Sequence, residues 1–126
     1  CLDKPKAPGM KNKHYAPKGE LTIVTGEADA VITRINEFAE EAISRGEKTG
    51  IIATDETMEQ YRAHSVKSAG KRSDEVSIAR NLYRLLREFD DEEVTVIYSE
   101  SFAKGGIGQA IMNRLLKAAG HRILHV

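Results

Sequence analysis

The stretch LTIVTG, residues 21–26, decides how the rest of the chain is interpreted, because a run rich in β-branched side chains ends there at a glycine. A short apolar run closed by a turn residue is typical of a buried strand. Apolar residues then recur at helical spacing: Val31, Ile35, Phe38 and Ala42. Gly46 follows, and glycine commonly ends helices. The sequence therefore predicts a strand over residues 21–25 and a helix that ends near residue 46.

The same alternation continues toward the end of the chain. Apolar runs predict further strands at residues 50–54, 64–68, 94–98 and 122–126. Continuous apolar strands separated by helices are typical of a parallel sheet covered on both faces. Right-handed crossovers arrange such units in three layers. The predicted fold class is therefore a small three-layer, Rossmann-like α/β domain with a mainly parallel sheet over residues 21–126.

Three further helices are predicted between these strands. Asp55 is expected to cap a short helix that reaches about Tyr61, and either Ser73 or Asp74 is expected to cap a long one. The apolar face of the long helix is expected to hold Val76, Ala79, Leu82, Tyr83, Leu86 and Phe89. The last helix, residues 107–119, carries one apolar row formed by Ile107, Ile111 and Leu115.

Residues 1–20 differ from the rest of the chain. They hold all three prolines, Pro5, Pro8 and Pro17, together with several lysines and few apolar residues. Proline pushes the residue before it toward extended conformations. The sequence therefore predicts an extended linker arm ahead of the domain. Because residue 1 is Cys and not Met, the chain is expected to be a piece of a longer one.

Composition excludes several classes of protein. The 126 residues suffice for one globular domain with one core. Lys plus Arg and Asp plus Glu both number 19, so the net charge predicts no general attraction to nucleic acid or membrane. The single cysteine, Cys1, excludes an internal disulfide framework and a cysteine-rich zinc site. No apolar run reaches the roughly 18 residues of a membrane span. A cytoplasmic protein without a membrane partner is expected.

The loop after the third predicted strand is a candidate anion site. Binding sites in parallel α/β sheets collect where strands end and helices begin. This loop joins a glycine, two cations and a hydroxyl just before a helix: Gly70, Lys71, Arg72 and Ser73. Free amides and the positive end of a helix favour anions. The alternative, a solvated turn with a helix cap, stays open because the full phosphate-loop spacing is missing.

The loop after the fourth predicted strand is a candidate ligand loop. It contains three glycines, Gly105, Gly106 and Gly108. Glycines let the backbone approach a ligand or a neighbouring strand closely. The dinucleotide pattern is incomplete because residue 111 is Ile, so a tight packing turn is favoured over a ligand loop.

Other patterns carry less chemistry. Three arginines, Arg80, Arg84 and Arg87, follow one side of the long helix and would either contact RNA phosphates or form a solvated face. His121 and His125 lie four apart in a predicted strand with no third ligand close in sequence, so no metal site is predicted. Cys1 has no histidine placed to form a dyad, and no catalytic residue is expected in this chain.

Two motifs together resemble one family. The segment PGMKNKHYAP, residues 8–17, resembles the linker between the two domains of long-form threonylcarbamoyl-AMP synthases. The segment GIGQAIMNRLLKAAG, residues 106–120, resembles the C-terminal-domain signature of that family, and ARNLYRLLREFD, residues 79–90, agrees with it. The resemblance implies a Rossmann-like C-terminal domain preceded by a YrdC-type catalytic domain that lies outside this chain.

The resemblance also implies an activity. The family is a nucleotidyltransferase that condenses L-threonine, bicarbonate and ATP into threonylcarbamoyl-AMP and pyrophosphate, for the threonylcarbamoyladenosine modification of tRNA. ATP and a magnesium ion would be held mainly by the catalytic domain, which would be the partner of this chain. The fragment alone would form no product. Whether tRNA or tRNA-modification proteins are further partners stays open.

In this family the linker lies over the catalytic pocket, which implies that residues 1–20 are a lid. The residues expected to contact ATP or substrate are Tyr15, His14, Lys11 and Lys13. Lysines approach phosphates as point charges and aromatic rings offer planar surfaces. The family usually has an aromatic residue where this chain has Asn12, so no stacking is expected there. The alternatives are an independent nucleotide- or anion-binding module, or a tRNA or protein docking domain without chemistry.

Overall fold

The computed structural model describes residues 16–102 and 106–126 of the chain. These residues form five strands: β1 (Glu20–Thr25), β2 (Thr49–Ala53), β3 (Ser65–Ser68), β4 (Val96–Glu100) and β5 (Ile123–His125). They also form three α-helices and one 3₁₀ helix: α2 (Ala28–Ser44), α3 (Glu75–Asp91), α4 (Gly106–Ala118) and η1 (Met58–Gln60). Strands and helices alternate along the chain, as the sequence predicts.

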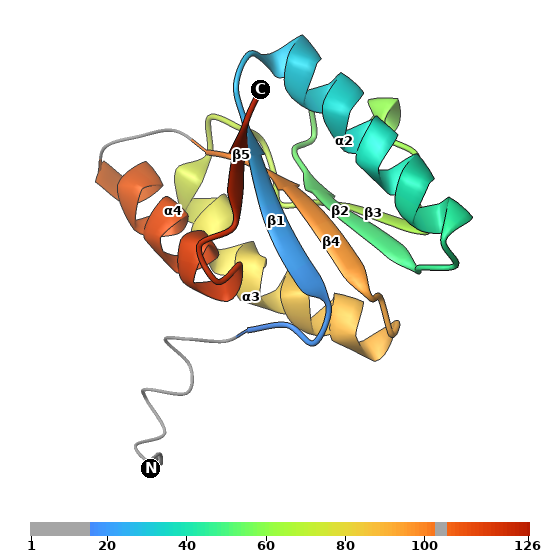
Figure 1. Ribbon diagram of the computed structural model, residues 1–126. Coiled ribbons are helices and arrows are strands. Elements are labelled where there is room, and N and C mark those ends of the chain that lie inside the picture. The colour runs from blue at the N-terminus through green and yellow to red at the C-terminus, as the bar shows by residue number, and fades with distance from the viewer. Residues whose placement is uncertain (1–15, 103–105) are drawn as a thin grey trace.

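All five strands are parallel, in the order β3-β2-β4-β1-β5. Helix α2 covers one face of the sheet, and α3 and α4 cover the other (Figure 1). The α2 crossover moves the chain toward β2, whereas the α3 and α4 crossovers move it in the opposite direction. Right-handed crossovers that run in opposite directions place their helices on opposite faces. The predicted three-layer, Rossmann-like α/β class is confirmed.

A separate apolar cluster fills each side of the sheet. Val31, Ile35 and Ala39 of α2 pack on Val24 and Ile51. The other side is larger and centres on α3 and α4, with fully buried Ile78, Phe89 and Ile111. Phe89 lies against bare backbone, because a Cβ at Gly50 would come within 2.7 Å of its ring. Glycine in β2 therefore permits the ring to approach the sheet.

Each α-helix ends in the same way. After α2, the amide of Gly46 donates to the Ile43 carbonyl and that of Glu47 to the Ala42 carbonyl, both at 2.9 Å. This pair of hydrogen bonds is the Schellman motif. It needs one residue in the left-handed backbone conformation, which glycine adopts at low cost. Gly46 and Gly120 fill that place after α2 and α4, with φ of 88° and 59°. Glu93 fills it after α3 with φ of 62°. The predicted helix end at Gly46 is confirmed.

The helix starts follow capping chemistry. Glu27 accepts a hydrogen bond from the Ala30 amide at the start of α2. Asp74 accepts one from the Ser77 amide at the start of α3, so of the two predicted caps it is Asp74 that serves. Asp55 caps no helix: η1 begins after Thr57, and the Asp55 carboxylate accepts the Ser68 hydroxyl at 2.5 Å. That prediction was wrong because a partner distant in sequence occupies the carboxylate.

Three other details differ from the sequence prediction. Val76 is 51% exposed, since it lies two positions, or roughly 200° around the helix, from the buried Ile78. Ile107 is 45% exposed in the first turn of α4, ahead of Ile111 and Leu115, which join the core. Strand β4 runs from residue 96 to 100 and not from 94 to 98, because the Val94 amide is bonded to Phe89 in the end of α3.

Candidate functional site

The sheet has a crevice where β1 and β4 end side by side. The chain leaves β1 for α2 on one face, whereas it leaves β4 for α4 on the other face. Such a point, where neighbouring crossovers diverge, is the usual ligand site of open α/β sheets. A pocket of about 200 Å³ lies there, lined by Gly26, Ala28, Val31, Thr57, Arg72, Glu100 and Ser101.

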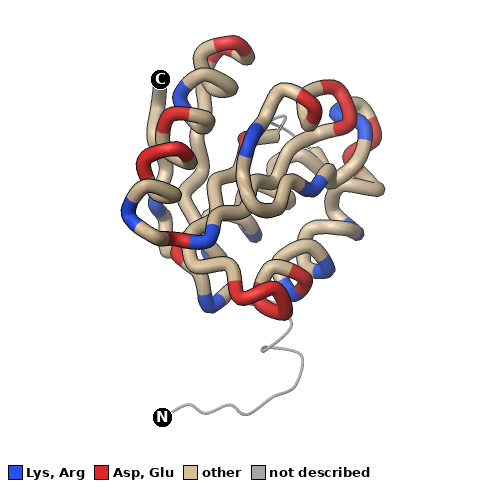
Figure 2. Tube along the Cα trace, turned by 90° about the vertical axis from the view of Figure 1, so that its right-hand side faces the viewer, with Lys and Arg blue, Asp and Glu red and all other residues tan. Residues whose placement is uncertain are grey.

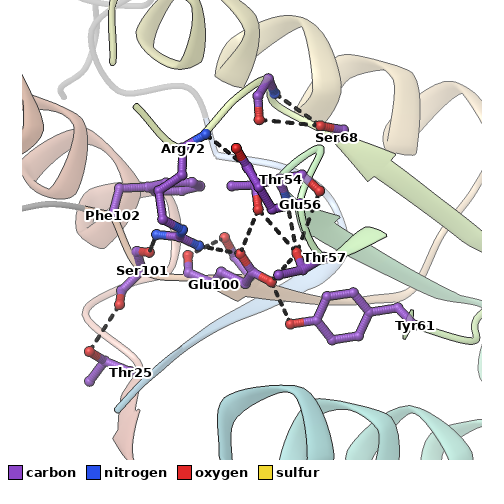
Figure 3. A network of polar contacts seen from close by, with 12 residues as sticks. Thr25, Thr54, Glu56, Thr57, Tyr61, Ser68, Arg72, Glu100, Ser101 and Phe102 are labelled. Atoms are coloured by element: carbon purple, nitrogen blue, oxygen red, sulfur yellow. Dashed lines mark hydrogen bonds and ion pairs between the residues drawn. The ribbon is translucent and has the colours of Figure 1, made fainter. Parts of the chain in front are cut away.

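Glu100, the last residue of β4, is the buried centre of the hydrogen bonds beside this pocket. Its side chain is 3% exposed. One carboxylate oxygen, Oε2, accepts the Tyr61 and Thr57 hydroxyls, each at 2.6 Å. The other, Oε1, accepts Nη2 of Arg72 and, at 3.5 Å, the Thr54 hydroxyl (Figure 3). A carboxylate is tolerated at this depth only when it is paired and hydrogen-bonded, and here both oxygens are.

Arg72 reaches the pocket from the loop between β3 and α3. Its Nη1 donates to the Ser101 carbonyl at 2.9 Å, and its guanidinium lies over the Phe102 ring at 5.6 Å (Figure 3). Its side chain is 43% exposed, so the guanidinium is held on one side and open on the other. Glu100, Ser101 and Phe102 therefore fix the orientation of a cation that still faces solvent.

Tyr61 serves the network as a hydrogen-bond donor. Burial, together with the hydrogen bond to Glu100, raises the pKa of its hydroxyl well above the usual 10.0. The hydroxyl therefore stays protonated at neutral pH and donates a hydrogen bond to the Glu100 carboxylate. Tyr61 thereby helps to hold the buried Glu100 carboxylate in place.

A second set of contacts holds the loop that carries Arg72. The Arg72 amide donates to Glu56 Oε1 at 3.1 Å, and this bond lowers the pKa of the Glu56 carboxyl. The Asp55 amide donates to the Gly70 carbonyl at 3.0 Å. These bonds tie the segments that follow β2 and β3 to each other, so the backbone that presents Arg72 is anchored at both ends.

The structure brings one residue of the candidate anion site to the pocket and leaves the others aside. Arg72 lines the pocket, whereas Gly70, Lys71 and Ser73 do not. Gly70 has φ of 129°, and its amide donates to the Ser68 hydroxyl at 3.0 Å, so it shapes a turn. Whether Arg72 binds an anion stays a prediction at this point.

The other predicted site residues lie elsewhere. Gly106 and Gly108 belong to the start of α4 and do not line the pocket. Gly105 lies outside the described residues, as do the four residues predicted for the lid: Tyr15, His14, Lys11 and Lys13. The predicted ligand loop and lid contacts therefore stay predictions.

Sequence reasoning missed the centre of the site. Glu100 and Tyr61 were not among the candidates, although they form the buried network with Thr57 and Thr54. The available signal was an acid directly after an apolar strand, but the predicted end of that strand at residue 98 obscured it. The partners of Glu100 lie 28 to 46 positions away in sequence, so no local pattern joins them.

The remaining candidates are exposed in the structure. Arg84 pairs with Glu88 at 2.8 Å on the outer side of α3, where Arg80 and Arg87 are also exposed. RNA contact by these arginines stays a prediction. In residues 16–102 and 106–126, no three His, Cys, Asp or Glu side chains gather as a metal site would require. No helix in the same ranges is long and apolar enough to cross a membrane.

Known proteins match this chain over nearly its whole length. A sequence model of the threonylcarbamoyl-AMP synthase C-terminal domain matches residues 2–120. The threonylcarbamoyl-AMP synthase of Bacillus subtilis is 43% identical over 122 residues, which are 97% of this chain and 34% of that protein. The Pyrococcus abyssi enzyme of the same name is 42% identical over 125 residues, 99% of this chain and 35% of that protein.

Solved structures agree. Pyrococcus abyssi Sua5 complexed with L-threonine has a TM-score of 0.81 at 41% identity, over 99% of this chain and 35% of that one. A variant of the same protein with a neighbouring histidine and tyrosine changed to alanine has a TM-score of 0.79 at 38% identity, covering 99% of this chain and 34% of that one. The C-terminal Sua5 domain of a hypothetical Pyrococcus horikoshii protein has a TM-score of 0.71 at 32% identity, over 88% of this chain and 100% of that one.

The last of these structures consists of the domain alone, so this kind of domain folds without a preceding one. This chain spans about a third of the length of the curated relatives it matches. The match over residues 2–120, supported by sequence identity and by the superposed fold, shows that the chain belongs to the family of threonylcarbamoyl-AMP synthase C-terminal domains.

Proposed function

We propose that this chain is the C-terminal part of an enzyme that forms threonylcarbamoyl-AMP and pyrophosphate from L-threonine, bicarbonate and ATP, for the modification of tRNA. The observation that carries the proposal is the family match over residues 2–120. Relatives named for this activity are about three times as long as this chain. The chemistry would therefore belong mainly to a YrdC-type catalytic domain joined to residue 1, and this chain alone would form no product.

In this proposal residues 1–20 form a lid over the catalytic pocket. Tyr15, His14, Lys11 and Lys13 would contact ATP or substrate. In the P. abyssi variant a neighbouring histidine and tyrosine are replaced together, and the dipeptide His-Tyr occurs once in this chain, at 14–15. A closed lid excludes water, which would otherwise hydrolyse a carbamate or a mixed anhydride.

The end of the arm next to β1 is fixed by hydrogen bonds, which suits a lid that must leave the domain in one direction. The Lys18 amide donates to Asp90 Oδ1 at 2.8 Å, and the Glu20 amide donates to the Thr95 carbonyl at 2.9 Å. Between them Gly19 passes so close to the start of β4 that a Cβ there would lie 2.7 Å from the Val94 carbonyl oxygen. The arm is thus fixed where it joins the amino end of β1.

The proposal assigns ATP and a magnesium ion mainly to the catalytic domain. L-threonine is the ligand of the P. abyssi structure and would be a substrate here. We expect the enzyme in the cytoplasm, where tRNA is modified, and contact of this domain with tRNA or tRNA-modification proteins stays a prediction.

The test uses the longer protein in which this chain occurs. Pyrophosphate release that requires both threonine and bicarbonate would be compared between the wild type and Tyr15→Ala. We expect a loss of tenfold or more in kcat/KM, which is about 1.4 kcal/mol of transition-state stabilisation. Tyr15→Phe separates the ring from the hydroxyl, and Lys6→Ala is a matched control within the same arm.

The outcomes separate the two parts of the proposal. An active wild type with an unaffected Tyr15→Ala variant would retain the enzyme and remove the lid assignment. A wild type that releases no pyrophosphate with threonine and bicarbonate present would contradict the proposed activity itself. Equal losses in Lys6→Ala and Tyr15→Ala would mean that the arm responds to any change, and the specific role of Tyr15 would be rejected.

A further inference from the structure

We propose that the pocket between β1 and β4 binds a small ligand that carries an oxyanion, a phosphate or a carboxylate group, through Arg72 and the first turn of α2. None of the residues that line this pocket is among those proposed for the lid. The pocket lies at the carboxyl ends of the strands, whereas the arm joins the amino end of β1 (Figure 1). At about 3.3 Å per residue, the six residues of β1 span roughly 20 Å, which separates the pocket from the point where the arm joins β1.

The hydrogen-bonding capacity that remains in the pocket is mainly that of donors. An arginine side chain has five N–H groups, and in the described structure two of the Arg72 groups are engaged, by Glu100 and by the Ser101 carbonyl. At the start of α2, the Ala30 amide donates to the Glu27 side chain, and the first intrahelical bond runs from the Val31 amide to the Glu27 carbonyl; the amides of Ala28 and Asp29 precede both. A ligand that satisfies these groups must offer acceptors.

The buried carboxylate acceptor of the pocket, Glu100, is in contrast occupied. Both Glu100 oxygens already receive two donors each. A cationic ligand would have to displace a buried donor to reach Glu100, which is costly at 3% exposure. An acceptor-rich ligand needs no such displacement.

Charge arrangement leads to the same class of ligand. Glu100 pairs with Arg72 from the buried side, and the guanidinium N–H groups that Glu100 and Ser101 leave unoccupied can donate to an oxyanion. The positive end of α2 lies on the other wall of the pocket and favours an anion as well. The Glu27 carboxylate, which caps α2 by accepting the Ala30 amide, and the exposed Glu56 both carry negative charge near this end of the helix, so they would keep the affinity modest.

The size of the pocket limits the ligand. Its volume of about 200 Å³ is below the roughly 300–1,000 Å³ of pockets that hold drug-sized molecules. Val31 and Ala28 supply an apolar wall beside the polar groups. A phosphate, a pyrophosphate or a short carboxylic acid fits this space, whereas a whole nucleotide exceeds it.

The experiment is an NMR titration of the 126-residue chain at constant ionic strength with inorganic phosphate, pyrophosphate and acetate, each tested separately. We expect saturable shifts of the amides of residues 26–29 and of the Arg72 side-chain N–H groups at millimolar concentration. Shifts with the phosphates alone identify a phosphate ligand, and shifts with acetate alone identify a carboxylate. Either result supports the oxyanion site.

Two variants make the test specific. Ala28→Glu puts a negative charge at the first position of α2, where acids favour the helix, and leaves the Glu100 network intact. A unit charge roughly 6 Å from the anion, partly screened, should weaken binding about tenfold. The matched control is Ala110→Glu at an exposed position of α4, and this variant should bind as the wild type does.

The proposal is overturned by either of two results. One is the absence of saturable shifts at residues 26–29 with all three probes up to about 20 mM, a concentration well above the millimolar affinity proposed. The other is equal binding by the wild type and Ala28→Glu, which would show that the anion associates elsewhere. Loss of binding in both Ala28→Glu and Ala110→Glu would point to a general charge effect and would also reject the site.

Discussion

Removing the Tyr61 hydroxyl is the sharpest test of the buried network around Glu100. Tyr61 is 6% exposed, and its hydroxyl lies 2.6 Å from Glu100 Oε2. In Tyr61→Phe that oxygen keeps only the Thr57 hydroxyl as a close donor. Because hydrogen bonds to charged groups contribute about 1.5–3 kcal/mol, the variant should lose about that much free energy of unfolding at pH 7.

The pH dependence of this loss supplies an independent check. Burial and Glu100 raise the Tyr61 pKa in the folded state above its unfolded value of 10.0. A raised pKa stabilises the folded state fully below pH 10, and this contribution is lost as the pH rises above that value. For one group the loss is about 1.4 kcal/mol per pH unit. Tyr61→Phe lacks it, so the stability gap between the wild type and the variant should narrow between pH 10 and 11.

Urea unfolding of both proteins at pH 7, 9, 10 and 11 would measure these differences. A double-mutant cycle with Glu100→Gln assigns the effect to the pair, because Tyr61→Phe should cost clearly less when the carboxylate is absent. A cost below about 0.5 kcal/mol at pH 7, within the range of ordinary surface substitutions, would refute the reasoning. A gap that stays constant up to pH 11 would refute the assigned pKa direction.

Two further predictions concern the helix ends. Gly46→Ala forces alanine into the left-handed conformation, although its Cβ would meet no atom within 4 Å, and should lower the free energy of unfolding by about 1 kcal/mol. Glu93→Gly relieves the same conformation after α3 and should raise the free energy of unfolding by up to about 1 kcal/mol. Changes of equal sign for the two variants in denaturant unfolding would contradict this reasoning. The bonds from Ser77 lower the pKa of Asp74, so this cap stabilises the fold above the unfolded value of 3.8 and loses its effect as the pH falls. Asp74→Ala should therefore destabilise at pH 7 and make little difference at pH 2, and an equal cost at both pH values in thermal unfolding would reject the cap.

The order of strands and helices was predictable because it rests on local signals. Leu21, Ile23 and Val24 form a continuous apolar run, and a strand buried on both faces needs one. Gly46 and Asp74 mark a helix end and a helix start through their own backbone and side-chain chemistry. These signals act within a few residues, so a single sequence carries them.

The candidate site was predictable only at Arg72. The loop from Gly70 to Ser73 stood out by composition, but the loop amides do not form the pocket and the Arg72 side chain turns instead toward β4 (Figure 3). Val76 shows the same limit on a smaller scale, since its apolar character placed it on the core face and the helix rotation exposes it. The identity of such a residue is local, but its surroundings are not.

Charge illustrates the difference at the level of the whole domain. The sequence determines that acids and bases are equal in number, and Figure 2 shows both signs spread over the surface, with acids dense at the end of α3. Only the folded chain decides which of them are paired. Lys67 of β3, for example, lies 3.3 Å from Glu88 and 2.9 Å from Glu92, which follow it by 21 and 25 positions.

The sequence by itself determined the α/β class, the end of α2 at Gly46, the start of α3 near Asp74 and the family, because each follows from patterns of neighbouring residues. The tertiary structure alone decided that β1 and β4 lie side by side with their crossovers on opposite faces. That arrangement opens the pocket and gathers Tyr61, Arg72 and Glu100 from three separate loops and strand ends. A buried carboxylate needs partners within about 3 Å in space, and distance along the chain does not limit which residues supply them.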